Sequence, residues 1–88
     1  MSTLPSITAE ELRQIRAELD LTQARFGDLM GVSRLTVWKW ENDHIKRDNG
    51  AVAQLARLYR TLFRLGVSTD QLLAGVEGLD RYLTMHES

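Results

Sequence analysis

Between Leu21 and Asn42 the chain reads LTQARFGDLMGVSRLTVWKWEN. Thr22 is a good N-cap for a short helix, because its hydroxyl can accept a hydrogen bond from a backbone N–H of the first turn. Gly31 can adopt the left-handed backbone conformation that ends such a helix. Ser33 caps another helix only two residues later, which ends near Asn42. These signals predict two short helices joined by a tight glycine turn.

Helical signals continue on both sides of this pair. A capping box over residues 8–11, in which the last carboxylate reaches back to the cap, opens a helix predicted to run to about Leu19. A polar, basic connection at 44–49 precedes a helix predicted over 50–65 and closed by Gly66. The buried side of that helix is predicted to consist of Val52, Leu55, Ala56, Tyr59, Leu62 and Phe63.

A second capping box, at residues 68–71, opens a fifth helix with one apolar stripe. Gly75 and Gly78 each weaken this helix by about 1 kcal/mol relative to alanine, so the helix needs a surface to pack against. The residues of the stripe are Leu72, Val76, Leu79 and Leu83.

The composition bounds the class of protein. The 88 residues suffice for one domain, and the single proline and the absence of sustained alternation favour an all-α fold over 1–88. The absence of cysteine excludes disulfides and thiolate metal sites, and His44 and His86 have no second ligand at helical spacing, so no metal or cofactor is expected. No catalytic constellation is visible. The short apolar runs predict no membrane partner and a cytoplasmic location.

The order of a capped helix, a glycine turn and a second capped helix is that of a helix-turn-helix. A closer resemblance is carried by the leucine before Thr22-Gln23, the small Gly27, the Gly31-Val32-Ser33 turn and the apolar-x-x-apolar-Glu-Asn ending at Asn42. Residues 8–73 thereby resemble the Cro and phage-repressor proteins of the XRE family. The resemblance implies a five-helix domain with its core at 8–67, its helix-turn-helix at 22–42 and an additional C-terminal helical segment at 68–88.

The helix that follows Ser33 is expected to have an inward and an outward face. Trp38 lies two residues from the inward Trp40, about 200° round the helix axis, and must point to nearly the opposite side. An exposed tryptophan implies a partner surface, either a DNA groove or the C-terminal tail packed over it. Gly27 should permit a close helix crossing behind this face. The residues expected to read bases in the major groove are Arg34, Leu35, Trp38 and Lys39.

Other residues are expected to contact phosphates. Gln23 lies in the first turn of its helix, where backbone N–H groups and the helix dipole favour an anion. Asn42, Lys46 and Arg47 follow the third helix and match a family loop that grips the DNA backbone. The resemblance also implies a structural ion pair between Arg16 and Glu41.

Charge is unevenly distributed along the chain. Residues 1–33 carry 3 basic and 5 acidic groups, residues 34–67 carry 7 and 3, and residues 68–88 carry 1 and 4, giving balances of −2, +4 and −3. The basic middle indicates that one face meets a polyanion. The arginines of the fourth helix, at 57, 60 and 64, are interpreted as its solvated outer face.

These features predict a sequence-specific transcriptional regulator without enzymatic activity. Because the family domain usually ends shortly after Leu73, the stripe of the fifth helix is expected to pair with a second chain, giving a homodimer on a palindromic operator of double-stranded DNA. The resemblance implies a repressor of its own operon, of a kind common in phages, plasmids and toxin-antitoxin pairs. The alternative is an antitoxin-like module that neutralises a partner protein through the fifth helix and Trp38, with DNA binding secondary.

Overall fold

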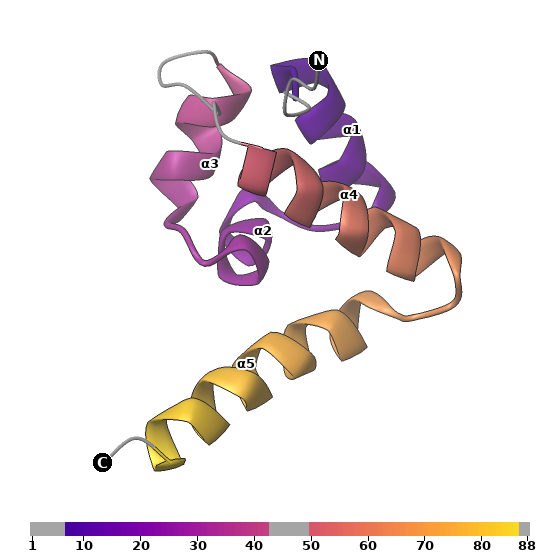
Figure 1. Ribbon diagram of the computed structural model, residues 1–88. Coiled ribbons are helices and arrows are strands. Elements are labelled where there is room, and N and C mark those ends of the chain that lie inside the picture. Colours follow the sequence, from indigo (N-terminus) through magenta and orange to yellow (C-terminus); the bar gives the residue numbers. More distant parts are fainter. Residues whose placement is uncertain (1–6, 43–49, 87–88) are drawn as a thin grey trace, which may run out of the picture.

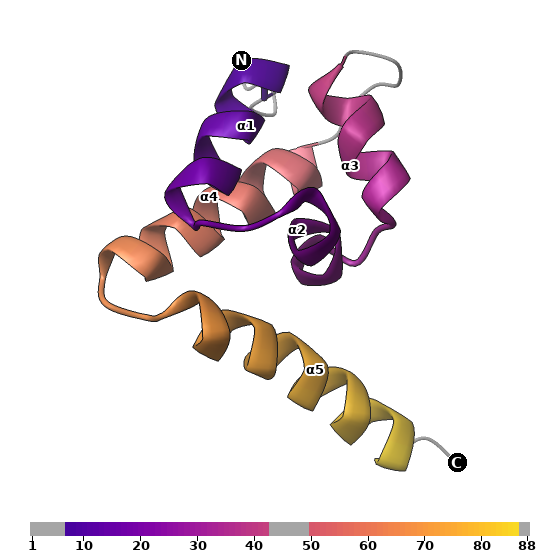
Figure 2. The ribbon, with the colours of Figure 1, turned by 180° about the vertical axis from the view of Figure 1, so that it is seen from behind.

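A computed structural model of the chain describes residues 7–42 and 50–86, with side chains as far as residue 78. Helices α1 to α4 form the body of the molecule, and α5 runs away from it after the α4–α5 turn (Figures 1 and 2). Because these ranges hold helices and no strand, the all-α prediction is confirmed. None of the helices in the described ranges combines the length and the apolar character needed to span a membrane. The helices are α1 (Ala9–Glu18), α2 (Gln23–Met30), α3 (Arg34–Glu41), α4 (Gly50–Arg64) and α5 (Thr69–His86).

The helices begin where local side chains can satisfy their first backbone N–H groups. The N-caps of α1, α2 and α3 each accept a backbone N–H three residues on, at 3.0, 3.1 and 3.1 Å; they are Thr8, Thr22 and Ser33. At α5 the capping box is complete, since the Ser68 hydroxyl accepts from the Gln71 N–H and the Gln71 side chain accepts from the Ser68 N–H. Gly31 ends α2 with φ at 77°, as predicted.

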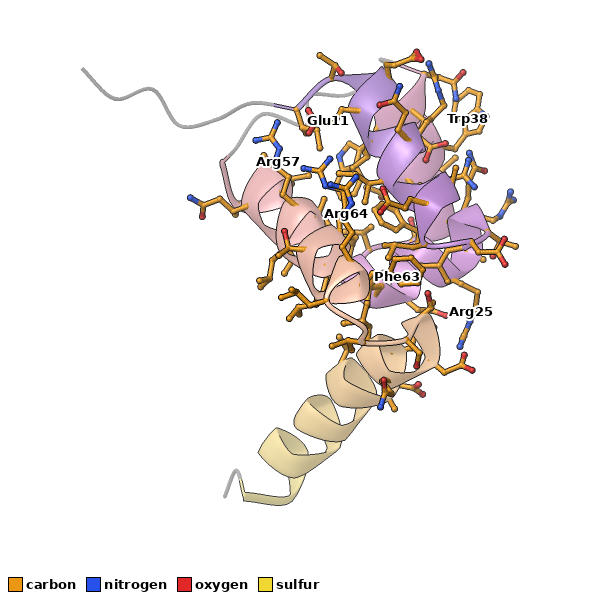
Figure 3. The ribbon with its side chains drawn as sticks, turned by 90° about the vertical axis from the view of Figure 1, so that its right-hand side faces the viewer. Glu11, Arg25, Trp38, Arg57, Phe63 and Arg64 are labelled. Carbon is orange, nitrogen blue, oxygen red and sulfur yellow. The ribbon has the colours of Figure 1, made fainter. Side chains whose placement is uncertain are left out.

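Ion pairs between α1 and α4 correct two expectations. Glu11 does not reach back to its cap, because its carboxylate oxygens accept hydrogen bonds from Arg57 at 2.8 Å each, and Arg60 lies 3.6 Å away. Arg64 donates to Glu18 at 2.7 and 2.8 Å. The interpretation of these arginines as a solvated face is therefore wrong for Arg57 and Arg60, whose side chains are only 29% and 24% exposed, whereas Arg64 stays 60% exposed. All three pair with α1, and Figure 3 shows Arg57 and Arg64 on the side of α4 that faces it.

The core lies where the four helices of the body and the start of α5 meet. On α4 the fully buried side chains are the small Ala53 and Ala56, against which larger residues of the same helix pack only partly buried. The predicted buried side of α4 thus missed Ala53, whose small size lets the helix approach its neighbours closely. The largest fully buried side chains are Phe26, Leu12, Ile15, Leu19, Leu29 and Val37.

Gly27 allows the tight turn between α2 and α3. A Cβ at this position would lie 2.6 Å from the backbone carbonyl oxygen of Val32. The Val32 N–H in turn donates to the Gly27 carbonyl oxygen at 2.9 Å. The expected close helix crossing is therefore wrong, because the close approach is to the backbone of the turn.

The beginning of α5 belongs to the core. Leu72 and Leu73 are 6% and 4% exposed, and Val76 is partly buried against the same core. The prediction of Leu72 as a dimer-interface residue is therefore wrong, since its side chain is already covered within its own chain. The side chains of Leu79 and Leu83 lie outside the described residues.

Candidate nucleic-acid interface

The outward face of α3 carries the residues predicted to read bases. Arg34 is exposed, Leu35 is 56% exposed and Trp38 is 40% exposed, and all three line one open surface pocket. Lys39 is half-buried. The opposite side of α3 is anchored in the core, so the structure brings these side chains together on one exposed helix face.

The two tryptophans of α3 point to opposite sides. Trp40 is 6% exposed and packs in the core, whereas Trp38 is the exposed one. Figure 3 shows Trp38 at the far end of the molecule from α5, which therefore does not cover it. Packing of Trp38 under the C-terminal helix of its own chain, one of the two interpretations open from the sequence, is wrong.

A buried carboxylate at the end of α3 fixes this helix to α1 and α2. Glu41 is 2% exposed, and its two carboxylate oxygens accept hydrogen bonds from Arg16 at 2.7 and 3.0 Å. Arg16 also donates to the carbonyl oxygen of Leu21 at 3.0 Å, and Arg13 donates to the Glu41 backbone carbonyl oxygen at 2.6 Å. The expected Arg16–Glu41 pair is thus present in the structure, and it sets the angle at which α3 presents its outer face.

Gln23 lies at the same junction. Its Nε2 donates to the Glu41 carboxylate at 3.1 Å, which orients the amide and uses one of its two hydrogens. The backbone N–H groups of the first turn of α2 have no helical acceptors. A phosphate contact by Gln23 stays a prediction. Sequence reasoning missed the bond to Glu41, because the two residues are 18 positions apart and no local pattern links them.

Asn42 closes the C-terminus of α3. Its Nδ2 donates to the Trp38 carbonyl oxygen at 2.8 Å, and its backbone N–H donates to the carbonyl oxygens of Trp38 and Lys39. The side chain is exposed, and its second Nδ2 hydrogen remains for a phosphate oxygen. The other predicted phosphate contacts, Lys46 and Arg47, lie outside the described residues.

The charges of the molecule separate into paired and available ones. Hydrogen bonds from Arg57 hold the pKa of Glu11 below its ordinary value of 4.5, and hydrogen bonds from Arg64 lower the pKa of Glu18. Arg34 and Lys39, by contrast, have no carboxylate partner among the described residues. The face of α3 therefore offers cationic donors that the fold itself does not occupy. No cluster of His, Cys, Asp and Glu able to hold a metal ion occurs in the described part of the chain.

Two capped helices joined at Gly31, the second with an exposed face and a buried back, make up a helix-turn-helix domain of the DNA-binding class. Residues 9–62, more than half of the chain, match the family model described as a helix-turn-helix domain. The chain belongs to this XRE/Cro-like helix-turn-helix family, which confirms the resemblance found in the sequence; the family is typically non-enzymatic. No curated protein and no solved structure matches the chain.

Proposed function

We propose that the chain is a sequence-specific transcriptional regulator that inserts α3 into the major groove, and that it acts as a homodimeric repressor of its own operon. The observation that carries the proposal is the exposed face of α3, on which Arg34, Leu35 and Trp38 are uncovered while the back of the helix is anchored in the core. Membership of a DNA-binding helix-turn-helix family supports the groove as the partner of this face.

Each reading residue has a chemical role. The Arg34 guanidinium and the Lys39 ammonium donate to guanine O6 and N7, and a good bidentate contact of this kind discriminates against a wrong base by about 1–3 kcal/mol. Leu35, more than half exposed, presses on a thymine methyl group. Trp38 adds an apolar contact one helical turn further on. These contacts select a short half-site.

The phosphate-contacting residues lie on both sides of the base-reading residues of α3. Gln23 approaches one strand from the N-terminus of α2, and Asn42, Lys46 and Arg47 approach the other end of the half-site. The Arg16–Glu41 pair acts structurally, because it joins α1 to the end of α3 and orients the Gln23 amide. Binding strength and register come from these phosphate contacts, whereas base selectivity comes from α3.

Two copies are needed for a selective site. One helix-turn-helix reads only a few base pairs, whereas a two-fold dimer reads two half-sites about 34 Å apart. The part of α5 that leaves the body, with Val76 and the stripe residues Leu79 and Leu83, serves as the dimer element. Such a dimer on an inverted repeat blocks polymerase, and its occupancy follows the concentration of the protein.

Selection of bound fragments from random DNA tests this function. We expect an inverted repeat with half-site centres about one helical turn apart, bound at least about 10³-fold more tightly than random DNA in a gel shift. Enrichment of no sequence would contradict the proposal.

The second candidate function is an antitoxin-like module that holds a partner protein. The length of α5 beyond the body favours it, because that segment is available to another chain (Figure 1). The same gel shift separates the two functions: retention of the upstream DNA of the gene no better than random DNA would favour protein binding as the main task.

A further inference from the structure

The side of α4 that faces away from α1 carries no charge. The three charged residues of α4 are arginines, and all of them pair with carboxylates of α1. About a quarter of the residues in the chain are charged, yet the outward positions of this helix and its C-terminal neighbour are uncharged. We call them the α4 outer face: Ala51, Gln54, Leu55, Leu58, Thr61 and Leu65.

The apolar residues of the α4 outer face have the spacing of a helix-pairing seam. They stand at 51, 55, 58 and 65, with steps of four, three and seven residues. This repeat of 3.5 residues is the one that keeps a seam facing another helix. Leu58 is 51% and Leu65 77% exposed, and Ala51, Gln54, Leu55 and Leu58 line a surface groove. The face is therefore shaped for a helix.

Helix α5, by contrast, has no surface of its own chain to pack against beyond its first turns. Its contacts with the core involve Leu72, Leu73 and Val76, whereas the helix continues to His86 away from the body (Figures 1 and 2). A helix that contains two glycines is marginal in water without a packing partner. A Cβ added at Gly75 or Gly78 would meet nothing within 4 Å, so another helix can approach closely there.

We propose that the C-terminal part of α5 packs on the α4 outer face of a second copy, and reciprocally, in a two-fold dimer. Within one chain α4 and α5 diverge from their shared turn (Figure 1), so the contact joins two copies. The proposal rests on the homodimer proposed above and names the surface that receives α5.

Charge favours this pairing over a contact of α5 with α5. Segment 68–88 carries 1 basic and 4 acidic residues, so two α5 helices side by side repel. Pairing of α5 with the uncharged α4 outer face avoids this repulsion.

The buried surface area favours pairing of α5 with α4 over pairing of α4 with α4. A 15-residue helix offers a strip about 22 Å long and about 10 Å wide, small against the ~800 Å² per partner of a standard interface. Contact of α4 with α4 buries one such strip on each copy. The reciprocal arrangement buries two such strips on each copy, one of α4 and one of α5, because two-fold symmetry repeats the contact of α4 with α5.

Sedimentation velocity on the full chain tests the use of the α4 outer face. We expect Leu58→Glu to raise the dimer dissociation constant about tenfold or more, with an unchanged circular dichroism spectrum because the side chain is already half exposed. Gln14→Glu, which places the same charge at an exposed position of α1, is the matched control and should dimerise like the parent protein. A Leu58→Glu dimer as tight as the control would overturn the proposal.

Cysteine trapping identifies the occupant, since the chain contains no cysteine of its own. Leu58→Cys and Leu79→Cys chains of different tag length are mixed and oxidised. We expect the mixed disulfide in excess of the half that random pairing gives, and little linkage in either variant alone. Predominant linkage of Leu58→Cys with itself, or of Leu79→Cys with itself, would overturn the proposal, as would no linkage. Operator retention in a gel shift, measured in parallel, shows separately whether the regulator function stands.

Discussion

Replacement of Glu41 by alanine tests how the fold holds α3 in place. The substitution removes the carboxylate that accepts two hydrogen bonds from Arg16 and one from Gln23. It leaves the Arg16 guanidinium without its anion at a position where 23% of that side chain reaches water. The loss of folding stability in this variant therefore measures how much the junction between α1, α2 and α3 contributes.

The expected loss of stability follows from the burial of the Arg16–Glu41 pair. Removal of one partner from a buried ion pair costs about 3–5 kcal/mol. Arg16 keeps its bond to the Leu21 carbonyl oxygen and regains some hydration, so the lower end, about 3 kcal/mol, applies. In a domain of this size 1 kcal/mol shifts Tm by about 4–8 °C, so Glu41→Ala should lower Tm by about 12–24 °C.

Thermal melts followed by circular dichroism measure this loss. The control is Glu10→Ala, which breaks an exposed pair with Arg13 at 3.3 Å, worth at most about 1 kcal/mol. The double variant Arg16→Met with Glu41→Leu should recover most of the stability, since apolar replacement of both partners is often neutral. DNA binding by Glu41→Ala should fall in parallel with the folded fraction as temperature rises.

Two results would refute this reasoning. A Glu41→Ala melt within a few degrees of the parent protein would mean that the buried pair contributes little. Strictly additive losses in the Arg16 and Glu41 single and double variants would mean that the two side chains do not act as a pair.

Four further substitution experiments test the proposed interface and the fold. Arg34→Ala and Lys39→Ala should leave Tm unchanged and each cost about 1–3 kcal/mol of operator binding in a gel shift; equal losses on random DNA contradict base reading. Lys46→Ala should weaken all DNA and lower the salt slope by about 1, measured by titration at several salt concentrations. Gly27→Ala should destabilise the domain by about 1–3 kcal/mol in urea unfolding, because its Cβ would lie 2.6 Å from a turn carbonyl oxygen; an unchanged midpoint refutes the close approach. Because the pKa of Glu11 is lowered in the folded state, its stabilisation is present above pH 4.5 and is lost as pH falls below it; melts from pH 6 to 3 should show less of this loss in Glu11→Gln.

Much of the architecture follows from interactions between residues that are close together in the sequence. Thr22, Ser33 and Ser68 bond to backbone groups three residues away, and Gly31 adopts its left-handed conformation because it lacks a side chain, so neighbouring residues suffice to predict these helix ends. The opposite orientations of Trp38 and Trp40 follow from helix periodicity alone. Helix order, the turn and the outward face of α3 were therefore predictable from the sequence.

Only the tertiary structure decided which side chains meet across the chain. Arg57 and Glu11 are 46 positions apart, and no pattern in either helix shows that they pair. The sequence alone determined that Leu72 is apolar and on a helix stripe, but its burial depends on where the α4–α5 turn places that stripe. The physical reason is range: caps and periodicity act within one or two turns of a helix, whereas burial and ion pairing depend on how whole helices pack.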